Sequence, residues 1–155
     1  MAFSCSKKRI RAMTIAKIIA EREAGDVISC DVATPVAKAV EMLAGKRIGA
    51  LPVLRDGKIA GIVSERDVIY RLAESGRDCL DQPVEAIMTS PAVTVEPSTR
   101  IDDALALMTR RRFRHFPVVE NGMLIAFISI GDLVKNKIDE VEHEAEALRS
   151  YIQTA

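Results

Sequence analysis

Residues 126–134 read Ala-Phe-Ile-Ser-Ile-Gly-Asp-Leu-Val, and residues 61–69 read Gly-Ile-Val-Ser-Glu-Arg-Asp-Val-Ile. In each copy an apolar run ends at a serine, and an aspartate follows three residues after that serine. A short apolar run of this kind is typical of a strand buried on both faces. The serine is typical of the N-cap of the next helix, where its hydroxyl accepts from a free backbone amide. The stretch therefore predicts a buried strand that leads directly into a helix, twice in one chain.

The serine and aspartate of each copy have two interpretations. Ser64 with Asp67, and Ser129 with Asp132, match the capping box, which needs no ligand. The alternative is that each helix start faces a cleft. The helix dipole and free amides would then attract a phosphate, and the aspartate would accept from the two hydroxyls of a ribose. The residues alone leave both interpretations open.

The self-similarity extends well beyond these two stretches. Two-residue turns, Asp56-Gly57 and Asn121-Gly122, are typical of β-hairpins because both positions tolerate positive φ. They lie between predicted strands 48–54 and 59–63 and between their counterparts in the second half. Further pairs recur at the same offset: Thr34 and Thr99, Ala39 and Ala104, Pro52 and Pro117. Gapless similarity over about forty residues predicts one supersecondary unit built twice, each copy burying its open face against the other.

The predicted fold class is α/β (α+β), with two β-α-β-β-α repeats. A short strand over 27–30 opens the first repeat, followed by a helix with Thr34 at its N-cap and Pro35 in its first turn. A leading helix with Ile15, Ile18 and Ile19 on one face precedes it, capped by Thr14. Val84, Ile87 and Met88 repeat this spacing and predict a second leading helix. We expect a flexible leader over 1–13, repeats over 14–75 and 84–138, and a C-terminal amphipathic extension over 139–155.

Composition limits the functional classes. The 155 residues carry equal numbers of basic and acidic side chains, which argues against a general polyanion binder. Three scattered cysteines show no metal-ligand spacing and suggest reduced thiols in a cytoplasmic protein. No apolar run is long enough to cross a membrane. The basic leader, residues 1–12, is expected to be disordered, with a short transit peptide as the alternative.

The C-terminal helix carries an apolar seam. Its residues alternate in steps of four and three, as in coiled coils: Val134, Ile138, Val141, Ala145, Leu148 and Ile152. The helix either folds back on its own repeat or meets another copy of the chain. We favour a homodimer through the repeats and this helix, because a helix that extends past the repeat has little else to bury against.

These features resemble a known family. Gly49 to Val53 (Gly-Ala-Leu-Pro-Val), Arg114 to Val118 (Arg-His-Phe-Pro-Val) and the two Ser-x-x-Asp corners look like the CBS domain, named after cystathionine β-synthase. Two in tandem resemble a Bateman module, here a stand-alone CBS pair. The resemblance implies a pseudo-two-fold disc with two clefts between the repeats. It also implies an adenosine ligand, which would be AMP, ADP or ATP, with NAD(H) or S-adenosylmethionine also possible.

The resemblance gives roles to particular residues, and the two halves differ in them. Asp67 and Asp132 would hold ribose hydroxyls, with Ser64 and Ser129 beside the sugar and phosphate. Three further residues have no counterpart in the other repeat and belong to the predicted ligand sites: Arg66, Arg114 and His115. An arginine near a cleft stabilises phosphate through charge-assisted bonds, whereas a solvated Arg114 and a packed His115 are the alternatives.

Three functional readings follow. We expect a sensor of adenine nucleotides that signals to an unknown effector protein or through its own assembly. An assembly module without ligand is the first alternative. Nucleic-acid binding through Arg110–His115 is the second, and the neutral net charge argues against it. No convergent nucleophile, base and orienting group is evident, so we expect no enzyme, no catalytic cofactor and no metal.

Overall fold

The structure is a computed structural model that describes residues 13–23 and 25–154; the predicted leader, apart from Met13, lies outside these residues. The elements of the first half are α1 (Ile15–Ala20), β1 (Cys30–Asp31), α2 (Val36–Lys46), β2 (Ala50–Arg55), β3 (Lys58–Ser64) and α3 (Glu65–Ser75). Two 3-10 helices follow, η1 (Gly76–Asp81) and η2 (Val84–Ala86). The second half contains α4 (Ile101–Arg111), β4 (His115–Glu120), β5 (Met123–Ser129) and α5 (Ile130–Thr154).

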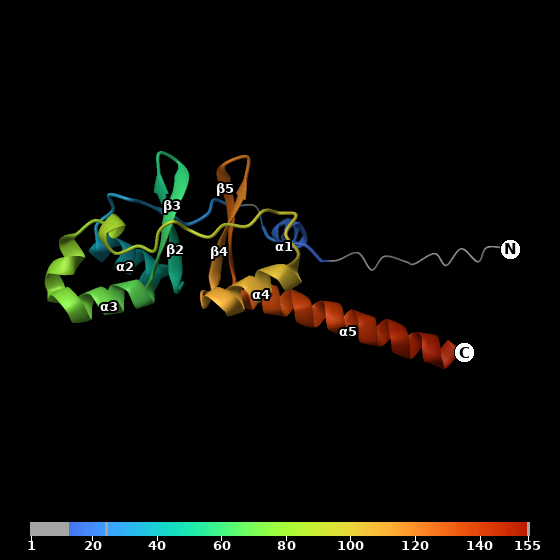
Figure 1. The fold of residues 1–155 in the computed structure, drawn as a ribbon. Coiled ribbons are helices and arrows are strands. Elements are labelled where there is room, and N and C mark those ends of the chain that lie inside the picture. Colours follow the sequence, from blue (N-terminus) through green and yellow to red (C-terminus); the bar gives the residue numbers. More distant parts are fainter. Residues whose placement is uncertain (1–12, 24, 155) are drawn as a thin grey trace.

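The predicted duplication is confirmed. The β2–β3 and β4–β5 hairpins stand side by side, with α2 and α3 beyond one and α1, α4 and α5 beyond the other (Figure 1). In the first repeat β1 pairs parallel with β2, which pairs antiparallel with β3. In the second repeat a single parallel bridge, Val95 to Val118, takes the place of the β1–β2 pair. The expected strand over 27–30 is therefore shorter and later than predicted, and the expected helix at Val84 is a 3-10 turn.

The predicted hairpin turns are confirmed, whereas the predicted N-cap of α2 is wrong. Both hairpin turns have positive φ at both positions, 51° and 76° at Asp56-Gly57 and 51° and 78° at Asn121-Gly122, as predicted. The start of α2 differs from expectation, because Pro35 and not Thr34 occupies the N-cap position. The Thr34 hydroxyl accepts instead from the Asp31 amide at 3.1 Å, which fixes the turn before the helix.

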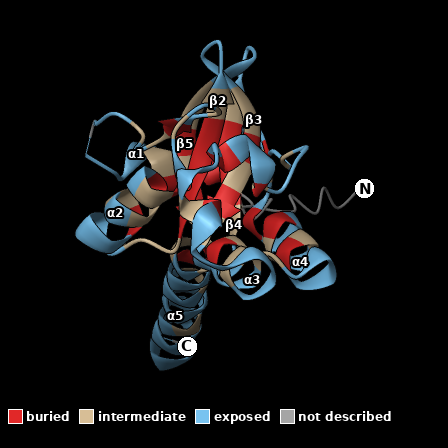
Figure 2. Ribbon diagram, turned by 90° about the vertical axis from the view of Figure 1, so that its left-hand side faces the viewer, coloured by how far each residue is buried: buried red, intermediate tan, exposed pale blue. Residues whose placement is uncertain are grey.

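Each repeat contributes its leading segment to the core of the other repeat. Ile15 and Ile18 of α1 lie in the core formed by α4, β4, β5 and α5, whereas Val84 and Ile87 lie in the core formed by α2, β2, β3 and α3. Buried segments run through both halves in Figure 2. Neither repeat can therefore bury its apolar surface without the other, which makes the pair one cooperative unit.

Backbone hydrogen bonds fix this exchange at both ends. The Ile15 amide donates to the Thr99 carbonyl at 2.9 Å, and the Val84 amide donates to the Thr34 carbonyl at 2.8 Å. Thr34 and Thr99 occupy equivalent positions in the two repeats. The exchange is thus reciprocal, as the expected pseudo-two-fold symmetry requires.

The C-terminal helix does not fold back on its own repeat. Helix α5 is continuous over 25 residues, and its C-terminal half projects away from the body of the molecule (Figure 1). Leu148 and Ile152 of the predicted seam are 63% and 73% exposed. The seam is therefore formed as a helical face but has no partner within the described part of the chain.

Strand β3 and the segment that follows η2 pack closely because residue 61 is glycine. The Ile62 amide donates to the Thr89 carbonyl at 3.0 Å, and the Thr89 amide donates back to Ile62 at 2.8 Å. A Cβ atom added at Gly61 would lie 2.7 Å from both the Met88 sulfur and the Thr89 carbonyl oxygen. The equivalent position on β5 is Ala126.

We predict that Gly61→Ala destabilises the protein by about 1–3 kcal/mol, because the added methyl group forces the Met88–Thr89 backbone away from β3. Urea unfolding measures this effect. Gly45→Ala is the matched control, since a Cβ atom at Gly45 in α2 has nothing within 4 Å. The control is expected to gain up to about 1 kcal/mol in helix propensity. Equal stability of Gly61→Ala and the parent protein would show that the segment does not pack as described.

Candidate functional site

The two serine–aspartate corners are capping boxes. At the start of α3 the Asp67 Oδ2 atom accepts from the Ser64 amide and from the Ser64 hydroxyl, both at 2.8 Å. The Asp67 amide donates to the Ser64 Oγ atom at 3.4 Å. The capping interpretation of the sequence is thereby confirmed for the first repeat. A carboxylate has more acceptor sites than one capping box uses, so the cap does not prevent a second partner.

The second corner has the same geometry and an additional partner. The Asp132 Oδ2 atom accepts from the Ser129 amide at 2.7 Å and from its hydroxyl at 3.0 Å. Arg22, from the connector after α1, donates through Nη2 to the same carboxylate oxygen at 2.5 Å and through Nη1 to the Phe127 carbonyl at 2.9 Å. The sequence interpretation missed Arg22, although a lone arginine between Glu21 and Glu23 in a lengthened connector was a visible signal.

The charge of Asp132 follows from this environment. Burial alone would raise the pKa of the Asp132 carboxyl group. The hydrogen bonds from Ser129 and the positive charge of Arg22 outweigh burial and hold that pKa below its ordinary value. The carboxylate is therefore ionised at neutral pH and is available as an acceptor.

A cavity of about 560 Å³ lies beside this corner, between the two repeats. Its wall comes from the connector after α1, from β2, and from β4 and β5, and includes Arg22, Val27, Ile28, Ala50, His115 and Phe127. This volume lies within the range of small-molecule sites, about 300–1,000 Å³. The lining combines aliphatic side chains with a few polar groups, which is the usual composition of such a site.

The cavity coincides with the longer of the two connectors. Eight positions separate Ile19 from Val27, whereas four separate the equivalent residues Met88 and Ala92. The short connector pairs directly with β3 above Gly61, and the Thr89 hydroxyl donates to Asp67 Oδ1 at 3.4 Å. The longer connector forms a wall of the cavity beside β5 instead. Connector length therefore makes the two corners unequal.

His115 is both packed and exposed to the cavity. Its ring stacks on Phe127 with centroids 5.3 Å apart and an angle of 14° between the planes. Burial lowers the pKa of His115, the charge of Asp132 opposes this, Arg114 lowers the pKa further, and Glu65 opposes it. The net shift is downward, so the imidazole is neutral at pH 7. His115 is therefore packed against Phe127, as one of the two interpretations predicted, and it also lines the cavity.

Of the predicted site residues, only His115 lines the cavity. Ser129 and Asp132 are not part of its wall and adjoin it through Arg22, which is.

The other predicted residues lie outside the cavity. Ser64, Arg66 and Asp67 belong to the first corner, and the Arg66 side chain is exposed. Arg114 is also exposed, and its backbone carbonyl accepts from the Ile130 amide at 2.8 Å. Arg110 and Arg111 lie in the last turn of α4 and Arg112 is its C-cap residue, where a cation interacts favourably with the helix dipole. That local role accounts for them without nucleic acid.

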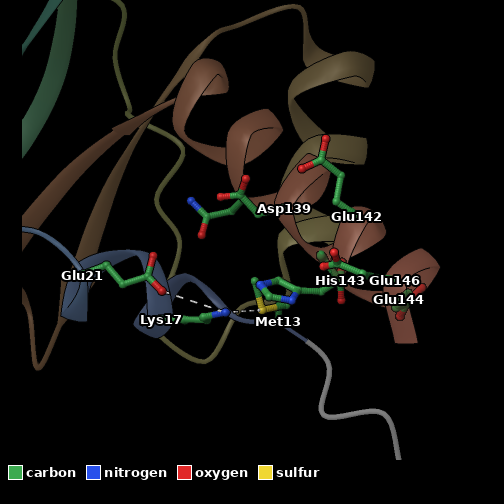
Figure 3. A pocket seen from close by; sticks show the side chains of 10 residues that line it. Met13, Lys17, Glu21, Asp139, Glu142, His143, Glu144 and Glu146 are labelled. Carbon is green, nitrogen blue, oxygen red and sulfur yellow. Dashed lines mark hydrogen bonds and ion pairs between the residues drawn. The ribbon is translucent and has the colours of Figure 1, made fainter. Parts of the chain in front are cut away.

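A second hollow, of about 490 Å³, lies between α1 and α5 (Figure 3). Carboxylates dominate it, and Lys17 donates to the Met13 sulfur at 3.1 Å within it. Within residues 13–23 and 25–154, no group of three histidine, cysteine or acidic side chains is arranged to hold a metal ion. The acidic lining disfavours phosphate, so this hollow does not compete with the cavity beside β5 for an anionic ligand.

The described cysteines have a structural role. Cys30 and Cys79 are free and buried. Burial, and to a lesser degree the charge of Asp31, raises the pKa of the Cys30 thiol to about 11, so this thiol is protonated and unreactive at neutral pH. None of the described helices is both long enough and apolar enough to span a membrane. The expected cytoplasmic location stays a prediction.

Two repeats that exchange their leading segments and enclose a cavity between their hairpins define a tandem-repeat module. The sequence model of the CBS domain matches residues 19–74 and again 84–139. The chain therefore belongs to the CBS domain family, and the resemblance inferred from its motifs is confirmed.

Similar proteins agree with this assignment. A mitochondrial CBS domain-containing protein of Arabidopsis thaliana is 35% identical over 134 residues, which are 83% of this chain and 65% of that protein. A signal-transduction protein with CBS domains from Burkholderia ambifaria has a TM-score of 0.76 at 40% identity, covering 82% of this chain and 95% of that chain. The CBS domain pair of protein MJ0100, solved with 5′-methylthioadenosine and S-adenosylmethionine, shares the fold (TM-score 0.71, 19% identity, 83% and 98% covered). The chain spans just under two thirds of the Arabidopsis relative.

Proposed function

We propose that this protein is a regulatory module that binds an adenosine ligand in the cavity beside β5. The observation that carries the proposal is the ionised Asp132 carboxylate, held at the start of α5 next to a cavity of suitable size. A carboxylate in this position accepts from the two hydroxyls of a ribose, as the acidic residue of dinucleotide-binding folds does. The adenosine compounds bound by protein MJ0100 support the ligand class.

The residues divide into two sets. At the second corner we propose that Ser129 and Asp132 contact the sugar and that His115 lies toward the phosphate. Arg114, which does not line the cavity, would contact the phosphate only by turning toward it. Ser64, Arg66 and Asp67 form the equivalent set at the first corner. We infer that the second corner binds more tightly, because the connector at the first corner already pairs with β3 and places the Thr89 hydroxyl on Asp67. The preferred ligand is AMP, ADP or ATP, with NAD(H) or S-adenosylmethionine as alternatives.

A ligand in the cavity would contact both repeats, and this contact could couple binding to their relative arrangement. Ala50 belongs to the first repeat, whereas His115 and Phe127 belong to the second, so a ligand in the cavity contacts both. Its binding energy then favours one relative arrangement of the repeats, by no more than its differential affinity for the two arrangements. We propose that a partner protein or the assembly of this chain reads that change, and that no catalytic step takes place.

A thermal-shift and calorimetry panel with AMP, ADP, ATP, NAD, NADH and S-adenosylmethionine tests the ligand. At a hundred times its dissociation constant, a bound ligand adds about 2.7 kcal/mol to stability. We expect Asp132→Ala to weaken the ligand at least about tenfold, since a hydrogen-bonded carboxylate is lost. Asp67→Ala is the matched control, because it removes the same type of capping box in the other repeat.

The outcomes separate the candidate functions. A stronger loss in Asp67→Ala than in Asp132→Ala would place the ligand at the first corner. No thermal shift with any of the six compounds would reject the ligand sensor and leave the assembly module.

We also propose a homodimer that buries the outer faces of α3 and α5. Both helices lie along the same lower side of the molecule in Figure 1. Their exposed apolar side chains are Ile69 and Tyr70 on α3, and Val134, Ile138, Val141, Leu148, Tyr151 and Ile152 on α5. Apolar residues that repeat in steps of four and three along a projecting helix form a continuous face, which is typical of an interface. Exposed apolar residues that are scattered singly do not show this spacing.

Ile138→Glu combined with Leu148→Glu is predicted to convert the dimer to monomer in analytical ultracentrifugation, because the two charges would be buried across the seam. Both positions are exposed in the single chain, so the substitutions should leave the monomer folded. We expect the monomeric variant to have the same unfolding temperature as the parent protein. Lys135→Glu, on the exposed surface of the same helix, is the control. A double variant that still sediments as a dimer would remove α5 from the interface.

A further inference from the structure

We propose that Arg22 makes the cavity beside β5 selective for phosphate-bearing adenosine ligands over uncharged or cationic ones. The inference rests on the proposed function and adds to it the charge of the ligand and the residue that selects it. The physical reason is that Arg22 holds the carboxylate that a ribose would have to reach.

The first step is that Arg22 already pairs with the Asp132 carboxylate. The guanidinium group of Arg22 is fixed at two points, the Asp132 carboxylate and the Phe127 carbonyl. The two side chains are only 37% and 34% exposed, so their ion pair is partly removed from water and is screened less than a surface pair. A ribose that takes the carboxylate must displace this cation or share the oxygen with it. An uncharged adenosine brings no anionic group of its own to pair with the displaced cation.

The second step is the availability of Arg22 to a phosphate. Among the described residues that line the cavity, Arg22 is the only arginine or lysine. His115, the other basic side chain of the wall, is neutral at pH 7 because burial lowers its pKa. A released guanidinium can bind a phosphate through two parallel hydrogen bonds. The phosphate then replaces the carboxylate as the partner of Arg22, so the guanidinium keeps an anionic partner.

The third step is the order in which the cavity prefers anionic, uncharged and cationic ligands. A cationic ligand such as S-adenosylmethionine brings a second positive charge toward the guanidinium without offering it a phosphate. Glu23 and Asp26 also line the cavity, yet both belong to the connector that carries Arg22 and neither holds its guanidinium. We therefore expect the order of affinity AMP, then adenosine, then S-adenosylmethionine.

The first corner provides an internal comparison. There the shorter connector places a neutral hydroxyl, that of Thr89, on the aspartate. Displacement of a hydroxyl leaves no unpaired charge. A phosphate-bearing ligand at that corner therefore has no advantage over an uncharged one from this contact. The selectivity is thus specific to the connector that is four positions longer and to the one arginine in it.

Isothermal titration calorimetry of the full chain with AMP, adenosine and S-adenosylmethionine tests the inference, with Arg22→Gln as the main variant. Gln retains a hydrogen-bond donor but removes the charge. We expect AMP affinity to fall and adenosine affinity to stay constant or rise, so that the AMP-to-adenosine ratio falls at least about tenfold. Arg55→Gln is the control, because Arg55 pairs with Glu85 outside the cavity and should leave the ratio unchanged.

The results separate this inference from the proposed function. If the parent protein binds AMP and Arg22→Gln keeps the same AMP-to-adenosine ratio, the role of Arg22 is wrong and the sensor stands. If the parent protein binds none of the three compounds, the sensor and the inference both fail. Should Arg22→Gln not fold, Arg22→Met, which keeps the aliphatic stem, gives the same comparison with the same expected fall.

Discussion

The structure depends on a reciprocal exchange of leading segments between the repeats. Ile15 completes the second core and Val84 completes the first, and both are fully buried. Since neither core is complete alone, the two hairpins are held side by side, with β3 against β5. This arrangement places both strand-to-helix corners next to the interface. The position of the candidate site is thus a consequence of core packing, and ligand binding there necessarily involves both repeats.

The exchange also explains why two similar corners are unequal. Each connector must cross the interface between its leading segment and its own repeat, but one is four positions longer. The short connector lies directly on β3, which Gly61 permits because no Cβ atom intervenes. The long connector forms a wall of the cavity and brings Arg22 to Asp132. Connector length therefore distinguishes the two corners of this duplicated fold, in addition to the residue differences at Arg66, Arg114 and His115.

The sequence predicted the features that depend on neighbouring residues. The hairpin turns and the capping boxes follow from residue types three positions apart or less, and both were correct. The exchange of Ile15 and Val84 was not predictable, because helical spacing indicates an apolar face but not the core that receives it. The Arg22–Asp132 contact joins residues 110 positions apart. The lengthened connector draws attention to Arg22, but no local pattern indicates Asp132 as its partner. The start of α2 was predicted wrongly for a local reason: the Asp31 amide, three positions away, donates to the Thr34 hydroxyl, and Pro35 occupies the N-cap position.

The central claim is that Asp132 and the cavity beside β5 form an adenosine site. A crystal structure of the protein with AMP tests it most directly. The account predicts a nucleotide in this cavity, with its ribose hydroxyls on the Asp132 carboxylate and the Arg22 guanidinium moved onto the phosphate. A nucleotide bound at the Asp67 corner instead, or an empty cavity with Arg22 still on Asp132 at saturating AMP, would contradict it.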